Sequence, residues 1–173
     1  MVLSDLNTYR QVIGCLMKKP LLLTEFQDIQ PMDFDIKIPR FVFIIIRNMF
    51  KSGAMELTPL EVDIEMENHE AAAVTYKSER GLDFLKESYD VSKLENFEYY
   101  YKRLKKLSLL RTLKKNNYDI SAYHKEEFDS FINKKEETIK KKYGVNKVYM
   151  PDGVTIKKVT TYDRDVDSNE EVY

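Results

Sequence analysis

The chain of 173 residues is poor in the residues that mark several common protein classes. Cys15 is the single cysteine, so no disulfide can form within one chain, and its apolar neighbours suggest a small core residue in a reducing cytoplasm. Five glycines and five prolines are too few turn signals for an all-β sandwich. Arg47 interrupts the longest apolar run, which is shorter than the about 20 residues of a membrane span. The N-terminus lacks the features of a secretion signal. We therefore expect a cytoplasmic, all-α protein that does not contact membranes.

Residue patterns that would support catalysis are also absent. The glycines are isolated, so the sequence contains no phosphate-binding loop of the GxxxxGK[ST] type. The only histidines, His69 and His124, lie far from each other and from Cys15, so a zinc site would need carboxylates. The acidic run around Glu65 and Glu67 is more typical of a solvated helix face. No Ser/His/Asp or Cys/His arrangement stands out. We therefore predict no catalytic residue, no metal ligand and no cofactor-binding residue in this chain.

Charge is distributed unevenly although the net charge is only −1. Residues 1–92 hold ten Lys/Arg against fifteen Asp/Glu, residues 93–143 hold fourteen against eight, and residues 144–173 hold four against six. An acidic first half is thus followed by a basic middle. This change in composition suggests a globular region at 1–92, a second region at 93–144, and a linker or tail at 145–173.

Apolar side chains fall on nearly every face of a predicted helix at 39–53. Pro39 suits the first turn of a helix and Gly53 suits its C-terminal end. The β-branched and aromatic run 41–46 also allows a buried strand, but apolar residues continue at helical spacing beyond it. A helix with this pattern is either the centre of a core or a face shared between subunits. Predicted helices on both sides, at 6–19 and 58–85, could surround it, so we expect a buried central helix.

A long amphipathic helix is predicted from residue 95 to about residue 115, where leucines and aromatic residues recur every three or four positions. A second helix, ending near Gly144, should pack antiparallel to it and form a helical hairpin. A small β-hairpin is expected at 147–162, around Pro151-Asp152-Gly153, followed by a disordered acidic tail. The all-α globular region is thus expected to be followed by a helical hairpin.

The apolar stripe of the hairpin is expected to pair the chain with itself, in a dimer or higher homo-oligomer, and to contact partners. Its members are Phe97, Tyr100, Tyr101, Leu104, Leu107, Phe128, Ile132 and Ile139. Basic residues lie beside three consecutive tyrosines, so a nucleic-acid contact through Lys102, Arg103, Lys105 and Lys106 is an alternative. The simpler interpretation, in which tyrosines pack the hairpin and lysines solvate it, is favoured, so DNA contact is expected to be indirect or weak.

Five short motifs follow one another between about residues 5 and 123. They are Arg10-Gln11-Val12-Ile13-Gly14-Cys15-Leu16-Met17, Asp33-Phe34, Arg40-Phe41-Val42-Phe43, Ser52-Gly53 with Leu57-Thr58, and the stretch 96–111, which begins Asn96-Phe97-Glu98-Tyr99-Tyr100 and ends Leu110-Arg111. In this order and spacing they resemble the N-terminal domain of DnaB-type replicative DNA helicases, especially those of phages and Gram-positive bacteria. Pro39 stands where that family usually has His, and the likeness fades after about Tyr123.

The resemblance implies a helical domain that builds the collar of a hexameric helicase and docks primase or a helicase loader. The ATPase motor of that family follows a linker, so ATP and magnesium are expected only for a motor domain that this chain lacks. An alternative is a free-standing phage or plasmid protein that binds and modulates a host helicase, loader or primase. We therefore expect a non-catalytic assembly and docking role in DNA replication.

Overall fold

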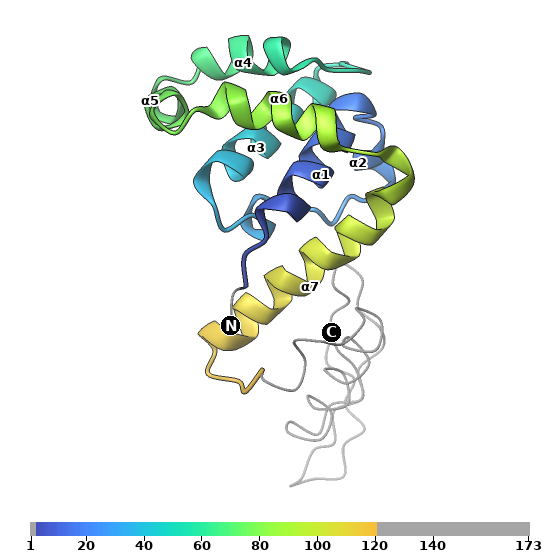
Figure 1. The fold of residues 1–173 in the computed structure, drawn as a ribbon, viewed down its shortest axis with the longest axis vertical. Coiled ribbons are helices and arrows are strands. Elements are labelled where there is room, and N and C mark those ends of the chain that lie inside the picture. Colours follow the sequence, from blue (N-terminus) through green and yellow to red (C-terminus); the bar gives the residue numbers. More distant parts are fainter. Residues whose placement is uncertain (1–2, 121–173) are drawn as a thin grey trace, which may run out of the picture. The chain divides into compact units, whose positions relative to one another are not determined.

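The computed structural model describes residues 3–120, which are helical without any strand (Figure 1). The α-helices are α1 (Leu6–Lys18), α2 (Leu22–Glu25), α3 (Lys37–Lys51), α4 (Pro59–Glu67), α5 (Glu70–Ser78), α6 (Gly81–Val91) and α7 (Phe97–Lys115), with 3-10 turns η1 (Pro31–Asp33) and η2 (Leu94–Asn96). The all-α prediction is thus confirmed for these residues. The expected second hairpin helix, the β-hairpin at 147–162 and the acidic tail lie outside them.

The ends of the helices follow from local sequence signals. Asp5 caps α1 by accepting hydrogen bonds from the amides of Asn7 and Thr8. Thr58 and Glu61 form a reciprocal capping box at the start of α4, as the Thr-Pro-Leu-Glu sequence predicts. Gly53 adopts a φ of +104° just after α3, which suits a residue without a side chain.

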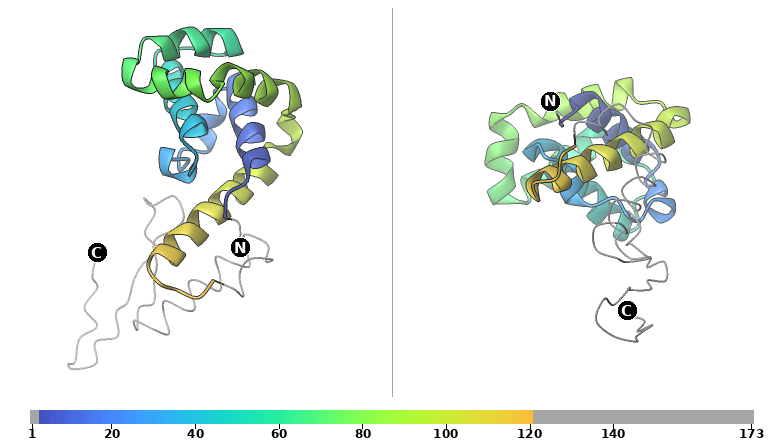
Figure 2. Two further views of the ribbon diagram at one scale, coloured as in Figure 1. Left: turned by 60° about the vertical axis from the view of Figure 1, so that its left-hand side comes forward. Right: turned by 90° about the horizontal axis from the view of Figure 1, so that it is seen from below.

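Helix α1 lies at the centre of the described unit, between α3, α6 and α7 (Figures 1 and 2). Nine of its thirteen residues are buried, including every position from Gln11 to Met17. Gly14 allows α6 to approach closely, because a Cβ atom there would lie 2.0 Å from the carbonyl oxygen of Ser88. The unbroken burial of α1 makes it the axis of the core.

The expectation that helix 39–53 is the central helix was therefore only partly right. One face of α3 is buried, through Val42, Phe43 and Ile46, while Asn48 and Lys51 face solvent. Helix α6 was expected to help surround α3, but it packs chiefly on α1 and α4. The physical reason is the close contact at Gly14, which draws α6 toward α1.

Helix α7 belongs to the same compact unit as the helices before it, and this unit extends to Tyr118. The division between a globular region and a separate hairpin near residue 92, which the sequence suggested, is therefore not seen as a boundary between compact units. The reason is aromatic packing: the Phe26 ring lies 5.0 Å from the Phe97 ring and 4.7 Å from the Tyr101 ring, centroid to centroid.

Within residues 3–120, every helix is too short or too polar to cross a lipid bilayer.

Candidate functional site

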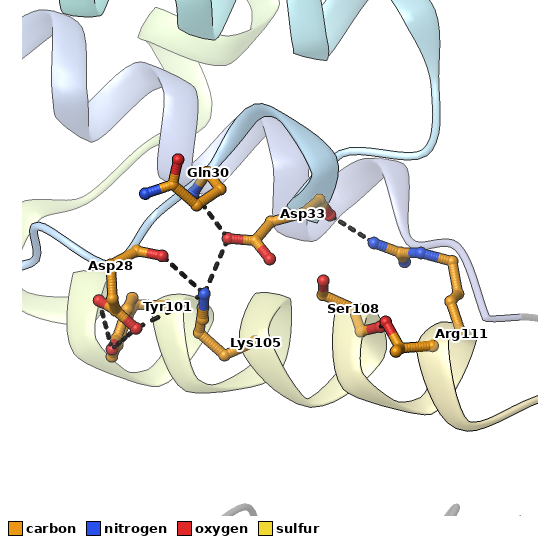
Figure 3. Close-up of polar contacts among 8 residues, drawn as sticks. Asp28, Gln30, Asp33, Tyr101, Lys105, Ser108 and Arg111 are labelled. Atoms are coloured by element: carbon orange, nitrogen blue, oxygen red, sulfur yellow. Dashed lines mark hydrogen bonds and ion pairs between the residues drawn. The ribbon is translucent and has the colours of Figure 1, made fainter. Parts of the chain in front are cut away.

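Buried charges hold α7 against the loop that connects α2 to α3 (Figure 3). We call this group of residues the α7 junction, and it consists of Tyr9, Asp28, Asp33, Asp35, Tyr101, Lys105 and Arg111. Its members come from α1, from the loop at residues 26–36 and from α7. The site is therefore assembled from segments that are far apart in the sequence.

Lys105 is the central cation of the α7 junction. Its ammonium group donates to the Asp28 carbonyl oxygen at 2.7 Å and to Asp33 Oδ2 at 3.0 Å, and it lies 3.5 Å from Asp28 Oδ2. The side chains of all three residues are less than one-tenth exposed. Since a buried ammonium group is stable only with charged and polar partners, Lys105 fixes where this part of α7 can lie.

The two carboxylates have further donors of their own. Tyr101, one turn before Lys105, donates its hydroxyl to both Asp28 carboxylate oxygens, at 2.8 and 2.9 Å. The backbone amide of Gln30 donates to Asp33 Oδ2 at 2.8 Å across the η1 turn. Pro31 begins that turn and presets its backbone angle. The loop is thus shaped locally before α7 packs on it.

Arg111 makes a second attachment about two turns further along α7. Its guanidinium donates to the Asp33 carbonyl oxygen at 2.5 Å, to the Leu3 carbonyl oxygen at 2.7 Å and to the Tyr9 hydroxyl at 3.2 Å. The Tyr9 hydroxyl donates in turn to Asp35. Burial, and after it this hydrogen bond, raise the pKa of Tyr9, so the phenol stays protonated. Two attachment points on one helix fix its direction as well as its position.

Arg103 makes a third, more exposed contact between α7 and α1. Its guanidinium donates to Asp5 Oδ2 at 2.7 Å, so the residue that caps α1 also forms an ion pair with α7. Burial raises the pKa of the Asp5 carboxyl, but the hydrogen bonds from Arg103 and Thr8 outweigh it, and the net pKa is lowered. The same ion pair raises the pKa of Arg103. Asp5 therefore stays ionised and keeps both roles.

The α7 junction holds charge without offering a reactive group. Its carboxylates are occupied by Lys105, Tyr101 and a backbone amide, and among residues 3–120 no group of three potential metal ligands comes together. Burial raises the pKa of the Cys15 thiol to about 11, so this thiol is protonated at neutral pH. What the arrangement can do is mechanical: it sets the direction in which α7 runs from the globular unit.

A shallow pocket of about 290 Å³ lies between α1, α3 and α6. Its apolar wall consists of Leu6, Ile36, Ile38, Pro39 and Phe84. Four of its charged groups pair with each other, Arg10 with Glu87 at 2.5 Å and Arg80 with Asp83 at 2.7 Å. The pocket therefore does not present an unpaired acid and base that face each other.

The predicted interface residues on α7 are placed differently from what the sequence suggested. Phe97 and Leu104 are members of the core that surrounds α1, and Tyr100 and Tyr101 are half-buried against it. Leu107 is buried too. Phe97 and Leu104 are thus already covered by their own unit, and the partner-binding role of the set stays a prediction, because a helix stripe looks the same whether it packs on its own domain or on another chain. Phe128, Ile132 and Ile139 lie outside the described residues.

The basic residues that were considered for DNA contact have intramolecular partners. Lys105 is buried with Asp28 and Asp33, Arg103 binds Asp5, and Lys102 lies 3.2 Å from Glu98 one turn earlier on α7. Lys106 is half-buried. The described part of this basic cluster therefore stabilises the fold. Lys105 departs from the interpretation that the sequence favoured, in which the lysines solvate the hairpin, because it is buried against Asp28 and Asp33.

The roles of Asp28 and Asp33 as partners of a buried lysine were missed from the sequence. The available signal was the register of α7, because Lys105 follows Tyr101 by four residues and so lies on the same helical face. A lysine on the face that carries Tyr101 and Leu104 is buried when that face packs, so its ammonium group needs carboxylate partners on the segment that packs against α7. Which of the many carboxylates would supply them depends on the tertiary structure alone.

Comparisons with known proteins give a distant relative from a prophage. No protein-family model matches the chain. The SPbeta prophage-derived uncharacterized protein YorI of Bacillus subtilis (strain 168) is 30% identical over 138 residues, which cover 79% of this chain and 27% of that protein. The match therefore spans about a quarter of the relative, whose name states a prophage origin and no activity.

Proposed function

We propose that this chain is the N-terminal assembly and partner-docking domain of a replicative DNA helicase, without catalytic activity of its own. The proposal rests on the motif order described above, which resembles this domain from the first helix through α7. It also fits the length of the prophage relative, since three-quarters of that protein lies outside the match and leaves room for a motor. ATP and magnesium would then bind only in such a motor. The proposed role in DNA replication also implies that the protein is located in the cytoplasm.

The observation that carries the proposal is a second apolar face on a helix whose direction is fixed. Leu107, Leu110 and Leu113 are buried but are not members of the core around α1. At about 100° per residue Leu110 and Leu113 are turned away from Phe97 and Tyr101, which attach α7 to that core, while Leu107 lies between the two faces. A helix needs one apolar face to join its own domain. The second face is already covered within the single chain, so it is suited to pack inside a helical hairpin whose outer surface then joins two copies.

We call Leu107, Leu110 and Leu113 the distal seam of α7. In the proposed role the distal seam packs in a helical hairpin, and paired hairpins build a dimer or a larger ring. The α7 junction holds the seam at a constant angle to the globular unit, which a closed ring requires of every subunit. The globular unit then remains available for primase or a loader, and contact with DNA is left to other parts of the assembly.

Sedimentation velocity of the full chain at increasing concentration tests the assembly role. We expect a dimer or larger species, and a shift toward monomer for Leu107→Ser and for Leu113→Ser. Circular dichroism must show that each variant keeps its helix content. Val74→Ser, at an exposed position of α5, is the matched control and should sediment like the unmodified chain. A chain that stays monomeric at every concentration contradicts the proposal.

A free-standing phage protein that modulates a host helicase, loader or primase is the second candidate, and the prophage origin of the relative favours it. The two candidates differ in the reading frame after Tyr173. A continuation into a phosphate-binding ATPase supports the helicase domain, whereas a stop codon at that point supports the modulator.

A further inference from the structure

Helix α4 carries apolar side chains on two opposite sides. Val62 and Met66 are completely buried against the rest of the unit, while Leu60 is 61% exposed and Ile64 is 55% exposed. Residues four apart share a helical face, and residues two apart point about 200° away from each other. The Leu60 and Ile64 side chains therefore form an outward apolar face, which the core of this unit does not use.

Carboxylates flank this outward face on both sides. By helical geometry Glu61 and Glu65 lie along one edge of it, and Asp63 and Glu67 lie along the other. Residues 54–79 as a whole hold seven Asp/Glu and a single Lys or Arg, Lys77, whose ammonium group lies 2.7 Å from Glu67. His69 Nε2 lies 3.7 Å from Glu65, and the Tyr76 hydroxyl donates to Asp63 at 2.8 Å, so these carboxylates have local partners but keep a net negative charge. The face therefore combines two apolar anchors with a strongly negative border.

Helix α4 lies at the outer edge of the unit, at the end remote from the last turns of α7, in both upright views (Figures 1 and 2). The distal seam of α7 and the outward face of α4 are thus on different parts of the unit. A molecule bound at one leaves the other accessible.

We propose that the outward face of α4 binds a cationic amphipathic helix of a partner protein. Leu60 and Ile64 pack between apolar side chains of that helix, which recur at three- and four-residue spacing, and the flanking carboxylates meet its lysines or arginines. Opposite charge on the two borders fixes the orientation of the bound helix and speeds its association.

The charge distribution favours a cationic helix over two other possible occupants of this face, a second copy of the chain and a membrane surface. A second copy of the chain that used the same face would bring two acidic borders together, which is unfavourable. A membrane surface rich in anionic lipids would repel the carboxylates. The inference does not depend on the helicase proposal, because it concerns a different face and a different partner.

Fluorescence anisotropy with the full chain and two labelled peptides tests the proposal. The probe is a helical peptide of about 18 residues, five turns long, made of leucine on one face and lysine on the other. Its counterpart has glutamate in place of every lysine. We expect the lysine peptide to bind and the glutamate peptide not to bind. The double variant Leu60→Ser/Ile64→Ser should weaken binding by about tenfold or more, and added salt should weaken it further.

The matched control is Met32→Ser, which changes an exposed apolar residue on η1, far from α4 in the sequence, and should bind the peptide like the unmodified chain. Circular dichroism confirms that both variants are folded. The proposal is overturned if the double variant binds the lysine peptide with unchanged affinity or if both peptides bind equally. It is also overturned if the double substitution abolishes self-association of the chain, because the face would then join two copies.

Discussion

Substitution of Lys105 by methionine tests whether the α7 junction holds α7 in place. Methionine is close to lysine in length and in helix propensity, so the change removes the charge without opening a large cavity or weakening the helix itself. It leaves the Asp28 and Asp33 carboxylates buried without their cation. Removing one partner of a buried ion pair costs about 3 to 5 kcal/mol.

The loss in the free energy of unfolding should lie at the lower end of the range of about 3 to 5 kcal/mol, because both carboxylates keep other hydrogen-bond donors. Asp28 still accepts from the Tyr101 hydroxyl, and Asp33 still accepts from the Gln30 amide. We therefore expect a loss of about 3 kcal/mol in the free energy of unfolding. In a urea titration followed by circular dichroism, this lowers the midpoint by about 2 M for a domain of this size.

Lys102→Met is the matched control on the same helix. Lys102 forms an exposed ion pair with Glu98, four residues earlier, and such pairs contribute at most about 0.5 kcal/mol. A difference of less than about 1 kcal/mol between the Lys105 and Lys102 variants would refute the reasoning. A double-mutant cycle with Asp33→Asn sharpens the test, since contacting charges should show a coupling of about 1 to 3 kcal/mol. Additive losses would mean that the two groups do not stabilise each other.

The remaining predictions concern α1 and its neighbours. Gly14→Ala should lower the melting temperature strongly, because the new Cβ would lie 2.0 Å from a backbone oxygen. Gly53→Ala is the control: this residue has a positive φ but lies in open space, so the change should lower the free energy of unfolding by only about 1 kcal/mol. Equal decreases in melting temperature for the two variants would contradict the close approach of α6 to α1. Cys15 should react with a thiol reagent at neutral pH only as fast as the protein opens, because burial raises its pKa to about 11, and rapid labelling of the native protein would show that it is accessible. The lowered pKa of Asp5 means that its ion pair with Arg103 stabilises the fold above the ordinary pKa of 3.8 and that this contribution is lost as the pH falls through the folded value. The stability difference between the unmodified chain and Asp5→Asn, measured by urea unfolding, should therefore be constant above about pH 5 and shrink as the pH falls below the ordinary pKa of 3.8, and a difference that does not change at low pH would exclude this linkage.

The sequence predicted the secondary structure well wherever the signal was local. The capping box at Thr58, the positive φ at Gly53 and the end of α7 near Asn116 were all readable, because each depends on residues within one turn of the chain. Helix α3 begins at Lys37 rather than at Pro39. This shift is small because the first turn of a helix leaves its amides unpaired, so proline fits at its third position as well as at its first.

The candidate site was less predictable, because its side chains meet across long stretches of chain. Lys105 was expected on the solvated side of α7, and its partners Asp28 and Asp33 precede it by more than seventy residues. Leu60 and Ile64 are exposed although they are apolar. Their spacing in the sequence identifies a helical face but does not tell whether another helix covers that face.

The sequence by itself determined that this protein is helical and where most helices begin and end, since caps, turns and apolar periodicity act over a few residues. Only the tertiary structure decided that α1 rather than α3 is the axis and that α7 is part of the globular unit. It also decided that one lysine among many is buried between two aspartates. These outcomes depend on contacts such as Gly14 with Ser88 and Lys105 with Asp28, which form only when distant segments pack together.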